Sequence, residues 1–187
     1  MTKDVIRVHQ DPCALDGAAW NALLDRQSRP TPFMRWEYLA ALHASGSAVP
    51  RTGWAPRFVT VHRGAQLVAA APAYLKSHSY GEYVFDWAWA DAYQRHGLRY
   101  YPKLLVAVPF TPVPGSRLLA TDDAARHTLL AGLAQVAEDE DASSVHLLFH
   151  EPDEIRVIAA QGWLARQGVQ FHWTQDPAAP HADFTAF

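Results

Sequence analysis

The sequence contains little cysteine and little charge. Its only cysteine is Cys13, so no disulfide can form within the chain, which is typical of a protein in a reducing compartment. Nothing around Cys13 indicates a catalytic thiol, and we expect a small packing residue there. Charged residues make up only 19% of 187 positions, and this composition excludes an intrinsically disordered chain. The net charge of −3 argues against a partner such as DNA.

Long apolar runs are also absent. The longest extends from Leu67 to Leu75, is interrupted by Pro72, and is too short to span a bilayer. The first ten residues lack the apolar core of a signal peptide. We therefore expect a cytoplasmic protein with no stable membrane insertion.

Several motifs that carry well-known chemistry are missing. The sequence has no glycine-rich dinucleotide or phosphate loop and no G-x-S-x-G. His146 and His150 are four residues apart on an expected strand, which places them about 13 Å apart and too far to share one ion. We therefore expect no metal cofactor.

The hydrophobic pattern predicts a mixed α/β fold in which helices cover a sheet. The expected strands lie near residues 5–8, 57–63, 66–76, 80–85, 103–108, 143–149 and 168–173. The expected helices lie near residues 16–27, 34–44, 86–96, 121–140 and 151–161.

Aromatic residues are the most unusual feature that is present. Nine of the 22 lie between Tyr80 and Phe110, where Glu82 and Asp86 are placed among them. One interpretation is an apolar cleft in which burial raises the pKa of a carboxyl group that acts as acid or base. The other is the edge of a core, in which Asp86 caps a helix and the carboxylates accept hydrogen bonds from indole and phenol groups. The aromatic excess also indicates covered surface, for which an oligomer is one explanation.

Two further segments have alternative interpretations. The loop 110–118 joins an apolar strand to a long helix, where backbone N–H groups, the turn at Gly115 and the charge of Arg117 suit an anion; the alternative is an ordinary loop shaped by proline. Tyr100, Tyr101 and Lys103 suit a contact patch for a substrate, or else the start of a strand from which Lys103 extends its ammonium group to solvent.

Three stretches of sequence together carry a resemblance to a known family. Residues 75–93, 100–104 and 108–113 closely resemble a bacterial family of N-acyltransferases described as peptidoglycan biosynthesis/recognition proteins, in the FemAB-like branch of the GNAT superfamily. The segment 168–173 is similar to a further signature of that family.

The resemblance implies a GNAT-like fold of the α+β type, with a mixed, mostly antiparallel central sheet flanked by helices. It implies transfer of an acyl or aminoacyl group to the amine of a small-molecule acceptor, such as a cell-wall precursor. The donor is acyl-CoA or aminoacyl-tRNA. The loop 110–118 departs from the GNAT pattern, because it has Gly115 alone and because Pro112 and Pro114 remove N–H donors.

Candidate site residues follow from the segment pattern and the resemblance. Glu82 and Asp86 are candidates for the acid or base, and the backbone N–H groups of Phe110 and Thr111 for the oxyanion donors. The candidates for binding substrate or donor are Tyr80, Trp87, Tyr93, Tyr101, Lys103, Phe110, Thr111, Gly115 and Arg117.

The family resemblance also sets expectations for domain organisation. We expect a GNAT-like domain over residues 1–174, and the start of a linker to a second, missing GNAT-like half over residues 175–187. The alternative to an enzyme is a non-catalytic recognition or scaffold half that packs on a catalytic second domain.

Overall fold

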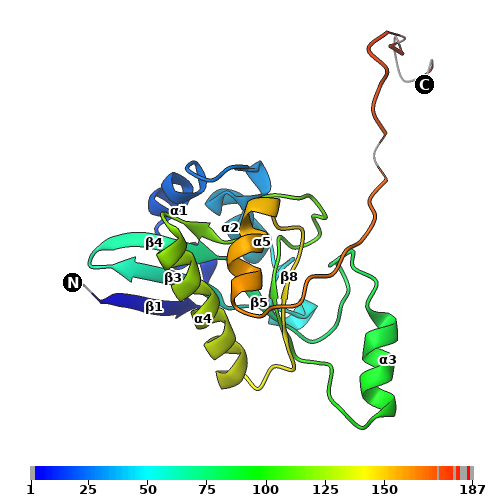
Figure 1. The fold of residues 1–187 in the computed structure, drawn as a ribbon, viewed down its shortest axis with the longest axis horizontal. Helices are drawn as coiled ribbons and strands as arrows, with labels where there is room; N and C mark the ends of the chain where they lie inside the picture. Colours follow the sequence, from blue (N-terminus) through cyan, green and yellow to red (C-terminus); the bar gives the residue numbers. More distant parts are fainter. Residues whose placement is uncertain (1–2, 172, 179, 182–184, 186–187) are drawn as a thin grey trace.

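The fold was analysed in a computed structural model, which describes residues 3–171, 173–178, 180–181 and 185 (Figure 1). The strands are β1 (Asp4–His9), β2 (Trp54–Pro56), β3 (Phe58–Arg63), β4 (Gln66–Ala71), β5 (Ala73–Lys76), β6 (Lys103–Val106), β7 (Leu119–Ala120) and β8 (Val145–Leu147). The α-helices are α1 (Gly17–Leu24), α2 (Trp36–Ala44), α3 (Trp87–Arg95), α4 (Asp123–Asp139) and α5 (Pro152–Ala160). Short 3-10 turns lie at Pro12–Ala14, Pro32–Met34 and Pro50–Thr52.

The strands form two four-stranded sheets. The first has the order β1-β3-β4-β7 and the second the order β2-β5-β6-β8. All pairs are antiparallel except β6 with β8, which is parallel. The chain passes from the first sheet to the second at Pro72, which cannot donate a ladder hydrogen bond and so separates β4 from β5.

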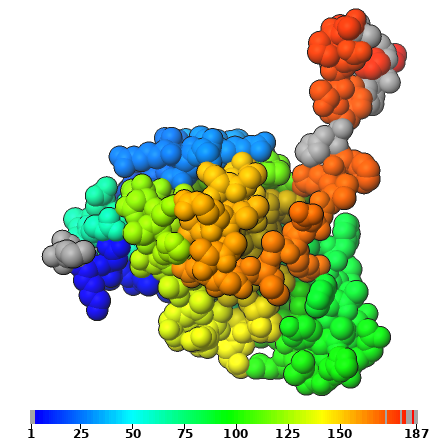
Figure 2. Space-filling model, in the orientation of Figure 1, coloured from blue at the N-terminus to red at the C-terminus, as the bar shows by residue number. Residues whose placement is uncertain are grey.

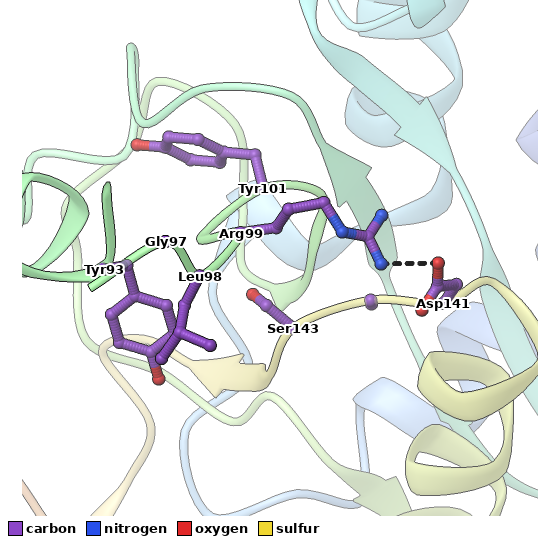
Figure 3. A pocket seen from close by; sticks show the side chains of 8 residues that line it. Tyr93, Gly97, Leu98, Arg99, Tyr101, Asp141 and Ser143 are labelled. Atoms are coloured by element: carbon purple, nitrogen blue, oxygen red, sulfur yellow. Dashed lines mark hydrogen bonds and ion pairs between the residues drawn. The ribbon is translucent and has the colours of Figure 1, made fainter. Parts of the chain in front are cut away.

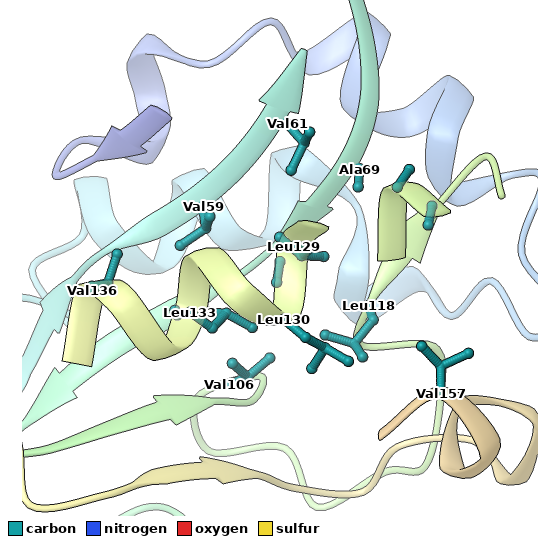
Figure 4. Packing of buried hydrophobic residues seen from close by; sticks show 14 of the residues in the cluster. Val59, Val61, Ala69, Val106, Leu118, Leu129, Leu130, Leu133, Val136 and Val157 are labelled. Atoms are coloured by element: carbon teal, nitrogen blue, oxygen red, sulfur yellow. The ribbon is translucent and has the colours of Figure 1, made fainter. Parts of the chain in front are cut away.

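Helices cover both faces of this layer of strands. One buried cluster joins α4 and α5 to the inner faces of β3, β4 and β6, as Figure 4 shows for Val59, Val106, Leu129 and Leu133. A second cluster joins α1 and α2 to the opposite face through Trp20, Leu39, Phe58 and other side chains. The strands β3, β4, β5 and β6 are thus held between two apolar layers, which is the arrangement expected from their near-continuous hydrophobic sequences.

Gly132 allows α4 to approach the sheet closely. A Cβ at this position would lie 3.1 Å from Ile6 and 3.5 Å from Val59. A glycine inside a helix costs roughly 1 kcal/mol relative to alanine. Gly132 therefore lowers the intrinsic stability of this helix but allows its close contact with β1 and β3.

The structure confirms the mixed, mostly antiparallel α/β fold and most of the predicted elements. The expected strand pair at 57–63 and 66–76 is present, with the second segment divided at Pro72. The long helix is present as α4, and its N-cap Asp122 accepts a hydrogen bond from the N–H of Ala125.

Two predicted strands are wrong. Residues 80–85 form a loop, because Gly81 and Tyr83 have φ angles of 80° and 58°, which a strand does not tolerate. The described residues of the segment 168–173 form no strand, and His172 lies outside the described residues. After α5 the chain instead runs as an extended arm away from the body (Figures 1 and 2).

No helix formed by the described residues combines the length and apolar character needed to cross a bilayer.

Candidate functional site

Two buried lysines face each other where β5 ends and β6 begins. Lys76 is the last residue of β5 and is paired in register with Lys103, the first residue of β6. Both side chains are completely buried. Because a buried ammonium ion is costly without a partner, each lysine requires nearby acceptors, and the loop 77–86 supplies them.

Lys103 is the centre of this buried cluster. Its Nζ donates to Glu82 Oε2 at 2.8 Å, to Asp86 Oδ2 at 2.6 Å and to Ser79 Oγ at 2.9 Å. Asp86 Oδ2 also accepts hydrogen bonds from the hydroxyl groups of Tyr100, at 2.7 Å, and Ser79, at 3.0 Å. We call Lys76, Ser79, Glu82, Asp86, Tyr100 and Lys103 the buried network.

Lys76 has a weaker set of partners. Its Nζ lies 3.4 Å from the centroid of a Trp54 ring, donates to the carbonyl oxygen of Tyr80 at 3.2 Å, and is 4.0 Å from Glu82 Oε1. Burial, which Lys103 reinforces by repulsion and Glu82 opposes, lowers the pKa of Lys76 to about 7. The ammonium form of this lysine is therefore readily lost near neutral pH.

The two carboxyl groups differ in their affinity for protons. Burial raises the pKa of Glu82, and attraction to Lys103 only partly offsets this effect. Burial would also raise the pKa of Asp86, but hydrogen bonds from Lys103, Tyr100 and Ser79 outweigh it and hold that pKa below its ordinary value. Within the network, Glu82 is thus the carboxylate that takes up a proton more easily.

Each carboxylate also has one oxygen with no hydrogen-bond partner among the described residues. These are Glu82 Oε1 and Asp86 Oδ1, and both atoms are buried. The acceptor capacity of the network therefore exceeds the donors that surround it, which leaves room for an additional proton on a carboxyl group.

Tyr101 connects the buried network to the surface. Its hydroxyl group lies 2.7 Å from Ser79 Oγ, and Ser79 in turn donates to Asp86. Tyr101 is half-buried and lines a pocket of about 340 Å³ together with Tyr93, Leu98 and Ser143, beside the ion pair of Arg99 with Asp141 (Figure 3). A chain of hydrogen bonds therefore runs from a pocket wall to Lys103 and the two carboxylates.

The network corrects two sequence predictions. Lys103 does not extend to solvent, because its whole side chain is buried against the carboxylates. Asp86 stands at the N-cap position of α3 but makes no capping hydrogen bond, because its side chain points to Lys103 and Tyr100 instead.

Sequence reasoning missed Lys76 and Ser79 and left the role of Tyr100 open. A detectable signal existed for the lysines: each lies at the end of a strand whose other residues are almost all apolar and buried. Because side chains alternate along a strand, Lys76 lies on the same face as the buried Tyr74.

Other predicted residues are nearby but outside the network. Tyr80 and Trp87 are exposed and pack on each other, with ring centroids 5.3 Å apart. Tyr93 packs edge-on against Tyr100 at 5.1 Å and lines the pocket. The Phe110 ring packs on Trp54 at 5.4 Å.

The backbone N–H groups of Phe110 and Thr111, which were predicted as oxyanion donors, have hydrogen-bond partners within the chain. The N–H of Phe110 donates to the carbonyl oxygen of Gly81, and that of Thr111 donates to the carbonyl oxygen of Val108. The Thr111 hydroxyl is also bonded, to Pro109 and Tyr38. These donors stabilise the loop itself.

At the predicted anion site around Gly115 and Arg117, the loop is closed by a carboxylate of its own chain. Arg117 is buried and donates to the carbonyl oxygens of Val113, Gly115 and Leu148. The backbone N–H groups of Arg117 and Leu118 both donate to Glu154 Oε1, at 2.9 and 2.6 Å.

Glu154 is well fixed in that position. Its second oxygen accepts the N–H of Glu151, and the N–H of Gly115 donates to the carbonyl oxygen of Phe149. Burial lowers the pKa of Arg117 to about 10 and raises that of Glu154. The loop therefore uses these donors to dock α5.

No group of three or more His, Cys, Asp or Glu side chains in the described part of the chain is placed to hold an ion.

Comparison with known proteins now identifies the family. The sequence profile of the FemAB-like family, described as peptidoglycan biosynthesis/recognition, matches residues 13–187. The chain belongs to the FemAB-like family. No protein of curated function matches this FemAB-like chain.

Solved structures share the fold of the FemAB-like chain. An aminoglycoside N-acetyltransferase in complex with CoA is 11% identical, with a TM-score of 0.53 over 93% of this chain and 96% of that one. A Trypanosoma brucei acetyltransferase is 10% identical, with a TM-score of 0.51 over 92% and 100% of the chains. An Acinetobacter haemolyticus aminoglycoside 6'-N-acetyltransferase is 11% identical, with a TM-score of 0.51 over 92% and 99%. These similarities show the GNAT fold.

The first prediction concerns Lys103. Lys103→Met leaves two carboxylates buried side by side without their shared cation, so we expect the free energy of unfolding to fall by about 3 to 5 kcal/mol. The exposed Lys3→Met is the matched control and should change it little. Urea denaturation measures both, and equal stabilities of the two variants would contradict the central role of Lys103.

The second prediction concerns the pH dependence of stability. The pKa of Lys76 is about 7 in the folded chain, against an ordinary value of 10.5, so between these pH values the unfolded chain binds more protons. Stability therefore rises with pH through this window, by at most about 1.4 kcal/mol per pH unit. Lys76→Met should remove this contribution in urea denaturation at pH 7.5, 8.5 and 9.5; an unchanged slope would show that Lys76 keeps an ordinary pKa.

The third prediction concerns Glu154. Glu154→Ala leaves three N–H groups without their acceptor, each at a cost of about 1 to 3 kcal/mol. Glu154→Gln keeps one acceptor oxygen and should destabilise less, and the exposed Asp153→Ala on the same helix turn should have little effect. Thermal unfolding compares the three variants. A Glu154→Ala variant as stable as Asp153→Ala would show that the loop does not depend on this carboxylate.

Proposed function

We propose that this chain is an N-acyltransferase-type protein whose buried network handles the proton of an acceptor amine. Membership of the FemAB-like family and the GNAT fold support acyl transfer as the reaction class. The observation that carries the proposal is the continuous chain of hydrogen bonds from pocket-lining Tyr101 through Ser79 to Lys103, Asp86 and Glu82.

The direction of these hydrogen bonds suits a base at the pocket. Ser79 donates to Asp86 and accepts from Lys103, so Tyr101 donates its own hydroxyl proton to Ser79. The Tyr101 oxygen then has lone pairs free to accept from a further donor. An acceptor ammonium placed there can give it a proton.

The proton then moves inward along the hydrogen bonds of the network. As the Tyr101 oxygen gains the proton of the ammonium, Tyr101 passes its own to Ser79, and Ser79 passes its own to Asp86. Asp86 holds a proton poorly, whereas Glu82 holds it better, and Lys103 bonds to both. Glu82 is therefore the final site of the proton, and the amine is left neutral to attack an acyl carbonyl.

We identify the acyl donor and the amine acceptor by chemical class. An acyl-CoA thioester and the ester of an aminoacyl-tRNA both present an activated carbonyl to an amine, and one of the fold neighbours was solved with CoA. The acceptor is a small molecule or cell-wall precursor with a free amine, which agrees with the description of the family.

The test follows acyl transfer to amine-bearing muropeptides, from acetyl-CoA by thiol release and from labelled aminoacyl-tRNA by product analysis. We expect Tyr101→Phe and Glu82→Gln to lower kcat/KM by about 10²- to 10⁴-fold, since each interrupts proton removal. Tyr83→Phe, which changes an exposed tyrosine of the same loop, is the control and should keep full activity. Full activity in folded Tyr101→Phe and Glu82→Gln variants would overturn the proposal.

A second candidate function is favoured by the closed loop at 110–118. Because Glu154 and backbone carbonyls occupy its donors, this domain suits a recognition half that binds the acceptor while another domain binds the donor. Muropeptide binding measured by titration calorimetry, together with silence toward CoA and no turnover, would favour this function over the first.

A further inference from the structure

Lys76 belongs to the buried network but takes no part in the proposed proton transfer. Its side chain is completely buried. An ammonium group has three N–H donors, and among the described residues that of Lys76 has one hydrogen-bond acceptor, the carbonyl oxygen of Tyr80. Lys103, by contrast, has three acceptors, all of them side-chain oxygens. Lys76 is therefore the lysine of this pair that its surroundings stabilise less well as a cation.

Glu82 lies between the two lysines. Its Oε2 accepts a hydrogen bond from Lys103 at 2.8 Å, whereas its Oε1 is 4.0 Å from Lys76 Nζ and has no hydrogen-bond partner among the described residues. The second distance is too long for a hydrogen bond. Both side chains are buried, however, so little water screens a charge on Lys76 from the carboxylate. The charge of Lys76 therefore acts directly on the affinity of Glu82 for a proton.

The charged and titratable groups that face Lys76 come from β6 and from the loop after β5. Lys103 faces it through the register of the two strands and repels its ammonium form. Burial and repulsion by Lys76 lower the pKa of His78, so this imidazole is neutral near pH 7. In the part of the chain that the structure describes, Glu82 is the only carboxyl group at ion-pair distance from Lys76. Glu82 is therefore the group whose charge is tied most closely to that of Lys76.

The net charge of the buried network depends on Lys76. The ammonium of Lys103 and the carboxylates of Glu82 and Asp86 together carry a net charge of −1. With Lys76 neutral, a proton that enters brings the network to zero. With Lys76 as an ammonium ion, the network is neutral already, and the same proton gives it a charge of +1. Because a buried net charge is costly, the network accepts a proton more readily in the first state.

We propose that Lys76 is a positioning residue for Glu82: as a neutral amine it allows the carboxylate to take up a proton, and as an ammonium ion it opposes that uptake. Lys76 receives no proton from the acceptor amine and acts through its charge alone. Burial lowers its pKa to about 7, which makes both forms accessible near neutral pH. This inference rests on the proposed function, because it concerns the same carboxyl group.

The first test requires no turnover. The full chain, labelled with carbon-13 at glutamate Cδ and lysine Cε, is titrated by NMR, and the variants Glu82→Gln and Lys76→Met identify the two signals. We expect Lys76 to lose its proton near pH 7. Lys76→Met should raise the affinity of Glu82 for a proton at least about tenfold. Glu82→Gln should lower that of Lys76 by a similar factor, because coupling between two sites is reciprocal.

The exposed Lys3→Met is the matched control for this titration and should leave both signals unchanged. A Glu82 signal with the same midpoint in Lys76→Met would overturn the inference. A Lys76 signal that is still that of an ammonium ion at pH 9 would do the same, and the wild-type chain alone gives this result, whether or not the variants fold.

The second test compares kcat/KM for acyl transfer at pH 6 and pH 8. We expect the ratio of Lys76→Met to the wild-type chain to rise about tenfold from pH 8 to pH 6, because Lys76 is mostly an ammonium ion at pH 6. The ionisation of the acceptor amine is the same for both proteins and cancels in the ratio. A purely structural role of Lys76 would change kcat/KM by the same factor at both pH values.

The two proposals fail in different ways. If activity depends on Glu82 but the ratio for Lys76→Met is the same at pH 6 and pH 8, the role of Lys76 is overturned and the proposed function stands. If the NMR titrations are coupled but folded Glu82→Gln keeps full activity, the proposed function is overturned, and the electrostatic control of Glu82 by Lys76 stands.

Discussion

The ammonium group of Lys103 holds together two parts of the chain that are separate in sequence. It joins the start of β6 to Ser79, Glu82 and Asp86 in the loop that follows β5. Each group is buried, so none can be satisfied by bulk water, and each depends on the others. The aromatic residues around them are a consequence, since Trp54 and Tyr100 enclose the cations and exclude solvent.

The sequence was informative where structure depends on local pattern. The helix at 121–140, the strands at 57–63 and 66–76 and the aromatic segment with its two carboxylates were all recognisable. The lysine pair was not, because Lys76 and Lys103 meet only through the register of two strands. A lysine at a strand end ordinarily extends to solvent. The loop at Gly81 and Tyr83 was mistaken for a strand because a positive φ at tyrosine leaves no sequence signal.

The same limit applies to the loop before α4. Arginine beside glycine at a strand–loop–helix junction predicts an anion site, and an anion does occupy it. That anion is the carboxylate of Glu154, which comes from a helix 36 residues beyond Leu118. The buried network lies instead at the strand ends, where Tyr101 connects it to a pocket.

The helix α3 follows this network and yet contributes no buried residue to the fold. Its restraints are the packing of Tyr93 on Tyr100, of Trp87 on Tyr80 and of Trp89 on Arg166, with Asp86 fixed at its start. The sheets, by contrast, are locked between two apolar layers. Displacement of α3 therefore costs little free energy compared with any change in the sheets. The wall of the pocket that Tyr93 of α3 supplies is therefore less restrained than the sheets.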